Sequence, residues 1–161
     1  MLQFTNTMRV LYEYGEKIKG LYLDKNLQSG YDPSAELQNV QFTVEHMGGT
    51  FSIVFNMPDY FRWAENGRGP GKMPPPGVLF KWMEFHQIMP QPVELPNGRT
   101  YLPSMQSVEY LIRRKIGRDG TQGSHNWEAT ETEIRESLIA AVKNALEKDF
   151  SEYMETVNAN R

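Results

Sequence analysis

The sequence contains no cysteine. A disulfide framework, a thiolate zinc site and a cysteine nucleophile are therefore excluded. A chain of 161 residues is nevertheless long enough to bury a working hydrophobic core without such help. We therefore expect a single domain spanning residues 1–161.

Long apolar runs and a strong excess of either charge are also missing. No run approaches the roughly 18 apolar residues of a membrane-spanning helix, and residues 1–10 do not have the pattern of a signal peptide. We expect a protein that is made and used in a cytosol-like compartment. The formal net charge of −3, with both signs mixed along the chain, gives no general reason for tight binding to nucleic acid or membranes.

Signals of catalysis are scarce. The three histidines, His46, His86 and His125, lie far apart and in no ligand spacing. Neither a phosphate-binding Gly-x-x-x-x-Gly-Lys-Ser/Thr motif nor the Gly-x-Ser-x-Gly elbow of many hydrolases occurs. We expect no enzyme activity, no cofactor and no metal, and a small hydrolase is the weakest alternative.

The first half of the chain shows two clear periodicities. Between residues 6 and 25, apolar side chains recur every three or four positions, which predicts a helix. Gly15 and Gly20 would each cost such a helix about 1 kcal/mol relative to alanine, so we expect close packing there. From Val40 to Met57 the apolar residues alternate around Gly48-Gly49, which predicts an antiparallel β-hairpin.

The second half predicts three further helices. A short one is expected over residues 78–87, followed by a loop or small hairpin over residues 90–103 around Asn97-Gly98. Ser104 is a natural N-cap for a second helix, which we expect to end before Gly117. Residues 117–127 are then expected to form a loop, and Thr130 with Glu133 resembles the capping box that begins a long C-terminal helix. This order of elements indicates an α+β fold.

One segment, residues 66–77, combines glycine with proline and is called the Gly/Pro arm below. Glycine opens the backbone and proline removes donors, so the arm is expected to be an ordered loop or a mobile segment. Aromatic residues flank it, and aromatics, methionine and arginine are enriched in the cores of protein interfaces. We therefore expect an interface made by the following residues: Tyr60, Trp63, Glu65, Arg68, Lys72, Met73 and Trp82.

Two groups of basic residues leave a second function open. Arg62, Arg68 and Lys72 flank the aromatic cluster, and residues 113–118 hold four more cations. Basic and aromatic residues together can bind single-stranded nucleic acid. A small nucleic-acid-binding module is therefore the main alternative, although the second group also lies where a helix C-terminus favours cations.

Residues 59–75, from Asp59-Tyr60-Phe61-Arg62-Trp63 through Gly67-Arg68-Gly69-Pro70-Gly71-Lys72-Met73-Pro74-Pro75, resemble the phage neck family of head-to-tail joining proteins, described as tail-completion or minor tail or capsid proteins. Trp82 in the following helix, the run Arg114-Lys115-Ile116 and the loop Gly120-Thr121-Gln122-Gly123 extend this resemblance. The likeness spans most of the chain, and its motifs are structural rather than catalytic.

The resemblance implies a structural virion protein that forms a ring of six or twelve copies at the phage head-tail junction. Its partners would be the portal or connector and tail proteins, with DNA passing through the bore without sequence readout. The protein would reside in the virion neck or tail, and in the host cytoplasm during assembly. In such an assembly Glu65 could pair with Arg68 or with an arginine of a neighbouring subunit.

Overall fold

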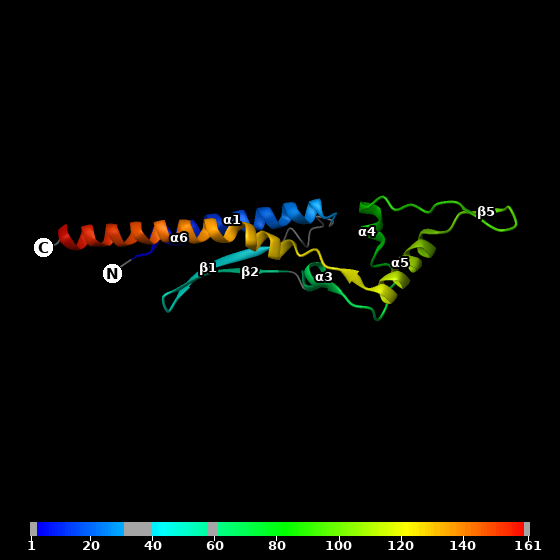
Figure 1. Ribbon diagram of the computed structural model, residues 1–161, viewed down its shortest axis with the longest axis horizontal. Helices are drawn as coiled ribbons and strands as arrows, with labels where there is room; N and C mark the ends of the chain where they lie inside the picture. The colour runs from blue at the N-terminus through cyan, green and yellow to red at the C-terminus, as the bar shows by residue number, and fades with distance from the viewer. Residues whose placement is uncertain (1–2, 31–39, 58–60, 160–161) are drawn as a thin grey trace. The chain divides into compact units, whose positions relative to one another are not determined.

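The computed structural model describes residues 3–30, 40–57 and 61–159 (Figure 1). It contains helices together with small antiparallel sheets, which confirms the α+β class. Contacts divide the chain into two compact units: unit 1 consists of Met1–Phe61 and His125–Arg161, and unit 2 consists of Arg62–Ser124. The prediction of one domain over residues 1–161 stays a prediction, because two contact-defined units can belong to one folding domain.

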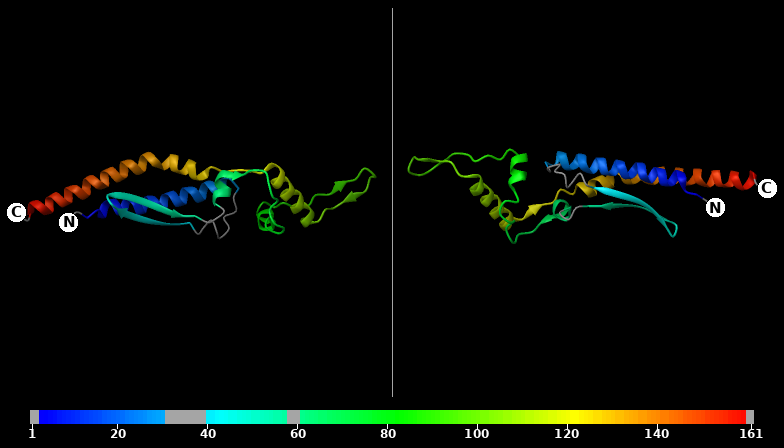
Figure 2. Two further views of the ribbon diagram at one scale, coloured as in Figure 1. Left: turned by 90° about the horizontal axis from the view of Figure 1, so that it is seen from below. Right: turned by 180° about the vertical axis from the view of Figure 1, so that it is seen from behind.

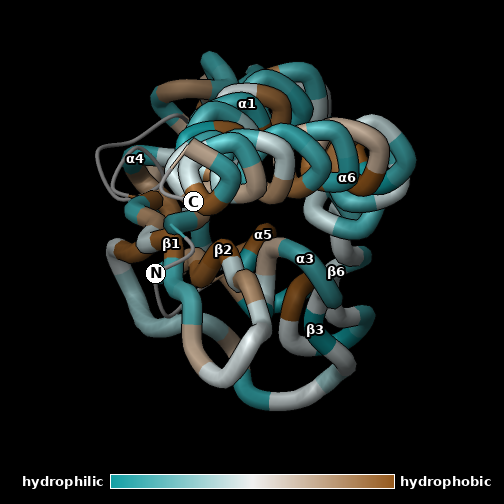
Figure 3. The backbone as a smooth tube through the Cα atoms, turned by 90° about the vertical axis from the view of Figure 1, so that its left-hand side faces the viewer, coloured by the Kyte–Doolittle hydropathy of each residue, from teal (hydrophilic) through white to brown (hydrophobic). Residues whose placement is uncertain are grey.

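Unit 1 pairs the two long helices of the chain. Helices α1 (Thr5–Gln28) and α6 (Asn126–Ala159) lie side by side in Figures 1 and 2. Teal and brown stretches alternate along both helices in Figure 3, so neither helix is apolar on all sides. Among the described helices, none has the length and hydropathy needed to span a bilayer.

The predicted β-hairpin is confirmed in the same unit. Strands β1 (Gln41–Met47) and β2 (Thr50–Asn56) pair antiparallel, with Met47 opposite Thr50. Gly48 and Gly49 make the turn at φ values of 57° and 81°. Such positive values are the reason why glycine is favoured in a two-residue hairpin turn.

The core of unit 1 is aromatic. Tyr22 of α1 and Val40 are almost fully buried, and the rings of Phe55, Phe61 and Trp127 pack against them. The Trp127 ring lies edge-on to Phe55 and Tyr22, with centroid distances of 5.1 and 5.5 Å. The prediction that Trp127 belongs to a loop is therefore wrong, because α6 begins before it and places its ring in the core.

The predicted close packing at a helical glycine is confirmed at Gly15. A Cβ atom there would lie 2.2 Å from the ring of Phe42, which itself contacts Tyr12 and Phe55. The missing side chain thus lets the hairpin approach α1. The same prediction is wrong at Gly20, because a Cβ atom there would meet nothing within 4 Å in the described part of the chain.

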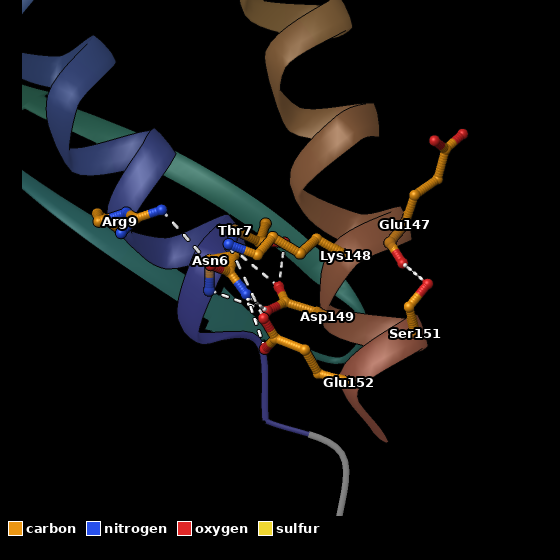
Figure 4. Close-up of polar contacts among 8 residues, drawn as sticks. All are labelled: Asn6, Thr7, Arg9, Glu147, Lys148, Asp149, Ser151 and Glu152. Carbon is orange, nitrogen blue, oxygen red and sulfur yellow. Dashed lines mark hydrogen bonds and ion pairs between the residues drawn. The ribbon is translucent and has the colours of Figure 1, made fainter. Parts of the chain in front are cut away.

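A buried carboxylate of α6 caps the start of α1 (Figure 4). The N-cap position of α1 is Phe4, whose side chain cannot accept a hydrogen bond. Asp149, only 2% exposed, accepts from the backbone amides of Asn6 and Thr7, both at 2.9 Å, and from the Thr7 hydroxyl at 2.6 Å. The free amides of the first turn thus find their acceptor on another helix.

The predicted start of the C-terminal helix at a Thr130 capping box is wrong. Helix α6 begins at Asn126, and the Thr130 hydroxyl donates to the Asn126 carbonyl at 2.7 Å from inside the helix. The Asn126 side chain donates to Asn26 of α1 at 2.9 Å and accepts from Ser29 at 3.1 Å. These contacts between helices place the start one turn earlier than the local pattern indicates.

Unit 2 is built from short elements. It contains β3 (Gly67–Arg68) paired with β6 (Thr121–Gln122), and β4 (Val93–Glu94) paired with β5 (Thr100–Tyr101). Its helices are α4 (Phe80–Phe85), α5 (Met105–Asp119) and most of α3 (Phe61–Asn66). The predicted short helix and small hairpin are confirmed, the helix with narrower bounds than expected.

Helix α5 begins as predicted and ends later than predicted. The Ser104 side chain accepts from the Ser107 amide at 3.2 Å, which confirms the N-cap. The helix continues through Gly117 to Asp119, and Gly120 at φ 77° follows it. Gly117 serves close packing instead, because a Cβ atom there would lie 2.8 Å from Cγ of Met73.

Candidate assembly interface

The Gly/Pro arm is ordered along α5. The Gly71 amide donates to the carbonyl of Gly117 at 2.8 Å, and Nε of Arg113 donates to the carbonyl of Pro74 at 2.7 Å. Within the arm, the Arg68 guanidinium donates to the carbonyl of Lys72. The arm is therefore an ordered loop, one of the two states expected from its composition.

A buried carboxylate, paired with a partly buried arginine, holds the end of this arm. Glu109 of α5 is 3% exposed and accepts from the Gly77 amide at 2.5 Å. Its other carboxylate oxygen lies 4.0 Å from the guanidinium of Arg113, one helical turn further on. A buried carboxylate needs such partners, since an isolated buried charge is very costly. We call Glu109 and Arg113 the arm latch.

Six of the seven predicted interface residues lie in described parts of unit 2, and Tyr60 lies outside the described residues. Trp63 is 60% exposed, and Met73 and Trp82 are also exposed. Glu65 is only 6% exposed, so its side chain is not on the surface of the folded subunit. Its proposed pairing with Arg68 stays a prediction.

Some side chains of the two basic groups form hydrogen bonds or ion pairs within the chain. Arg113, expected in the second group, is partly buried and held in the arm latch. Arg118 forms an exposed ion pair with Asp119, and the hydrogen bond from Arg118 lowers the pKa of the Asp119 carboxyl. Arg114, Lys115 and Arg118 remain exposed toward the C-terminal end of α5.

Unit 2 leaves most of its large apolar side chains exposed. Only Ala64 and Met83 are buried apolar residues in it. The exposed ones before residue 88 are Trp63, Met73, Val78, Trp82 and Phe85. Those from residue 89 onward are Met89, Val93, Leu95, Tyr101 and Leu102, with Tyr110 and Leu111 on α5. Extended apolar surface of this kind marks sites of protein association.

Two shallow apolar grooves lie within this surface. The first, of about 520 Å³, lies between the base of the β4–β5 hairpin and α5, and is lined in part by Val93, Tyr110 and Leu111. The second, of about 500 Å³, lies beside α4 and is called the α4 groove. Its lining residues are Phe80, Glu84, Gln87, Ile88, Met89 and Met105. Both grooves are open enough to receive side chains from another polypeptide.

The histidines do not converge on a site. His46 stacks on Phe51 of the adjacent strand, and His125 lies 3.7 Å from Glu128 at an exposed position. His86 packs against the ring of Trp82 in unit 2. Across the described ranges, no group of three or more histidine, aspartate or glutamate residues is arranged to hold a metal ion.

Sequence reasoning predicted a loop or small hairpin over residues 90–103 but not its exposed apolar surface, and it missed the arm latch. Glu109 and Arg113 looked like ordinary helix-surface charges, and a salt bridge at i,i+4 spacing was their only local signal. Comparison with known proteins adds no assignment: no family model, no curated protein and no solved structure matches this chain.

Proposed function

We propose that this protein is a structural subunit that assembles into a homo-oligomeric ring at a phage head-tail junction. The observation that carries this proposal is the exposed apolar surface of unit 2, where only two apolar side chains are buried. Large apolar side chains that are exposed in the isolated subunit are typical of obligate assemblies. The interfaces of such assemblies are as hydrophobic as a protein core.

The particular assembly is proposed from the resemblance of residues 59–75, Trp82 and residues 114–123 to the phage neck family. Such a ring would hold six or twelve copies, contact portal or connector and tail proteins, and let DNA pass without sequence readout. The protein would act by packing and not as an enzyme, would need no cofactor, and would reside in the virion after assembly in the host cytoplasm.

Native mass spectrometry and negative-stain imaging of the purified protein test this proposal. We expect one discrete closed species of six or twelve copies, formed either alone or on addition of portal or tail proteins. A chain that remains monomeric in both conditions would contradict the proposal.

Two single variants test whether the exposed aromatic residues hold the ring together. Trp63→Glu and Trp82→Glu each place a charge where we expect a buried contact, so both should shift the population to smaller species. Circular dichroism should show unchanged helix content, because both side chains are exposed in the subunit. Rings that form undiminished in both variants would remove these residues from the interface.

A further inference from the structure

Residues 89–103, called the hairpin arm, have very little support from the rest of their own unit. Every residue from 91 to 102 is exposed. Beyond the two short strands, the backbone bonds of the arm run from the Leu95 amide to the Arg99 carbonyl at 2.8 Å and from the Gly98 amide to the Leu95 carbonyl at 2.9 Å. In both views of Figure 2 this segment runs out beyond α4 and α5. An isolated two-stranded ribbon is only marginally stable in water.

The hairpin arm nevertheless carries apolar side chains. Val93, Leu95, Tyr101 and Leu102 are all exposed, the last at 62%. Polar residues would serve a free loop better, because exposed apolar edge strands promote unwanted association. The arm is therefore built to be covered by a surface that complements it.

The α4 groove is largely apolar, like the exposed side chains of the hairpin arm. Phe80, Ile88 and Met105 provide apolar walls, and Glu84 provides a carboxylate. The groove lies at the base of the hairpin arm, and the tip of that arm lies roughly 20 Å away by the rise of an extended strand. Met89 at the base of the arm lines this groove, but the tip of an arm cannot reach the groove at its own base, whereas the tip of another copy's arm can.

The charges of the two surfaces are also complementary. The hairpin arm carries one acid and one base, Glu94 and Arg99, and α4 carries one base and one acid, Lys81 and Glu84. None of these four side chains takes part in an ion pair within the described structure. Each charge on the arm thus has an unused opposite charge available on α4 of a second copy.

We propose that the hairpin arm of one copy docks in the α4 groove of the next copy. Because the two surfaces differ, the contact is heterologous and repeats from copy to copy until a ring closes. This inference rests on the proposed ring function and names the contact that links its subunits.

Cysteine cross-linking tests the contact directly, because the natural chain has no cysteine to interfere. In the double variant Leu95→Cys, Gln87→Cys, one cysteine lies on the arm and one in the groove. Oxidation should yield a ladder of covalent dimers, trimers and higher species on a non-reducing gel. The control pair Leu95→Cys, Lys148→Cys, with the second cysteine on α6, should yield no ladder.

A charge exchange provides the second test. Glu84→Arg and Arg99→Glu each place like charges at every contact, which should weaken association roughly fivefold to tenfold per contact. In an equimolar mixture of the two variants, every contact between unlike copies again joins opposite charges. The mixture should therefore recover assembly, with the two variants alternating around the ring.

The outcomes separate this inference from the function on which it rests. Rings without a cross-linked ladder, or rings insensitive to both charge reversals, would overturn the docking of the arm while leaving the ring function in place. A wild-type chain that forms no ring with or without virion partners would overturn both.

Discussion

At the scale of single residues, Asp149 shows how one side chain joins distant parts of the chain. Its carboxylate accepts from Thr7 and Asn6, which lie more than 140 positions earlier. Burial alone would raise the pKa of this carboxyl, but the hydrogen bonds from Thr7 and Asn6 outweigh burial and lower it below its ordinary value. The ionised form is therefore the one that the fold stabilises.

Replacing Asp149 by Asn should lower the free energy of unfolding by about 1–3 kcal/mol at neutral pH, because the buried amides lose a charged acceptor. Chemical denaturation measures this loss. Glu147→Gln is the matched control, since Glu147 is an exposed carboxylate on the same helix and should change stability by less than about 0.5 kcal/mol. Equal stability of the Asp149→Asn variant and the wild type would refute the capping role.

The same residue predicts a pH dependence. Because the pKa of Asp149 is lower in the folded state than in the unfolded state, its contribution is fully present above the unfolded value of 3.8 and is lost as the pH falls through the folded value. Unfolding free energies measured from pH 7 down to pH 2 should therefore converge for wild type and Asp149→Asn only below about pH 4. A constant difference across that range would contradict the assignment.

Two glycines of α1 predict opposite effects of the same substitution. Gly15→Ala should destabilise the protein by about 1–3 kcal/mol, because the new methyl group would overlap the packed ring of Phe42. Gly20→Ala has no such neighbour in the described structure and should stabilise the helix by up to about 1 kcal/mol. Thermal unfolding of both variants makes the comparison, and stabilisation by both substitutions would show that helix propensity outweighs packing at Gly15.

At the scale of elements, the arm latch determines whether the Gly/Pro arm stays on α5. Arg113→Ala would remove the partly buried partner of Glu109 and leave this buried carboxylate without its cation, which should lower the free energy of unfolding by about 1–3 kcal/mol. The amides of Gly71 and Gly77 should then exchange hydrogen faster than in the wild type. Arg114→Ala removes an exposed neighbouring arginine and should leave this exchange unchanged.

Helices and strands whose formation depends on residues close together in the chain could be predicted from the sequence. The apolar stripe of α1, the alternation on both sides of Gly48-Gly49 and the Ser104 N-cap each act within a few residues, and all three are confirmed. The start of α6 predicted at Thr130 was wrong, because the contact between Asn26 and Asn126 determines where this helix begins. Local patterns report propensity, and tertiary contacts override it.

The candidate interface was predicted only in part, for a similar reason. Composition singled out the Gly/Pro arm, but the bonds that hold it come from α5, roughly 40 positions away. The hairpin arm was predicted as a loop or small hairpin from Asn97-Gly98, but nothing in its sequence marked it as a contact surface. Its importance comes from exposure, which a single sequence does not display. Asp149 likewise could not be told apart from the other carboxylates of α6 before its partners were known.

At the scale of the whole molecule, the proposed assembly predicts a stability that depends on concentration. If the ring contacts bury the apolar surface of unit 2, association stabilises the folded chain by mass action. A tenfold rise in protein concentration should raise Tm by about 3–5 °C for a chain of this size. Leu102→Asp, a change on the hairpin arm, should reduce that dependence, and a concentration-independent Tm would contradict the proposal.

Salt should separate assembly from the nucleic-acid alternative. Apolar contacts respond weakly to salt, so the ring should persist as salt rises from 50 to 200 mM. A nucleic-acid-binding module would lose roughly a thousandfold in affinity over the same range if it neutralised about six phosphates. Fluorescence anisotropy with a short DNA, beside native mass spectra at each salt concentration, compares the two.

Since the acceptor for the first turn of α1 comes from position 149, the start of this helix cannot be completed until the last part of α6 has left the ribosome. Unit 2 is synthesised in between, as an insertion within unit 1. Contacts this distant in sequence form slowly and late in folding. The first turn of α1 therefore stays without its Asp149 acceptor while unit 2, which carries both surfaces of the proposed contact, is being synthesised.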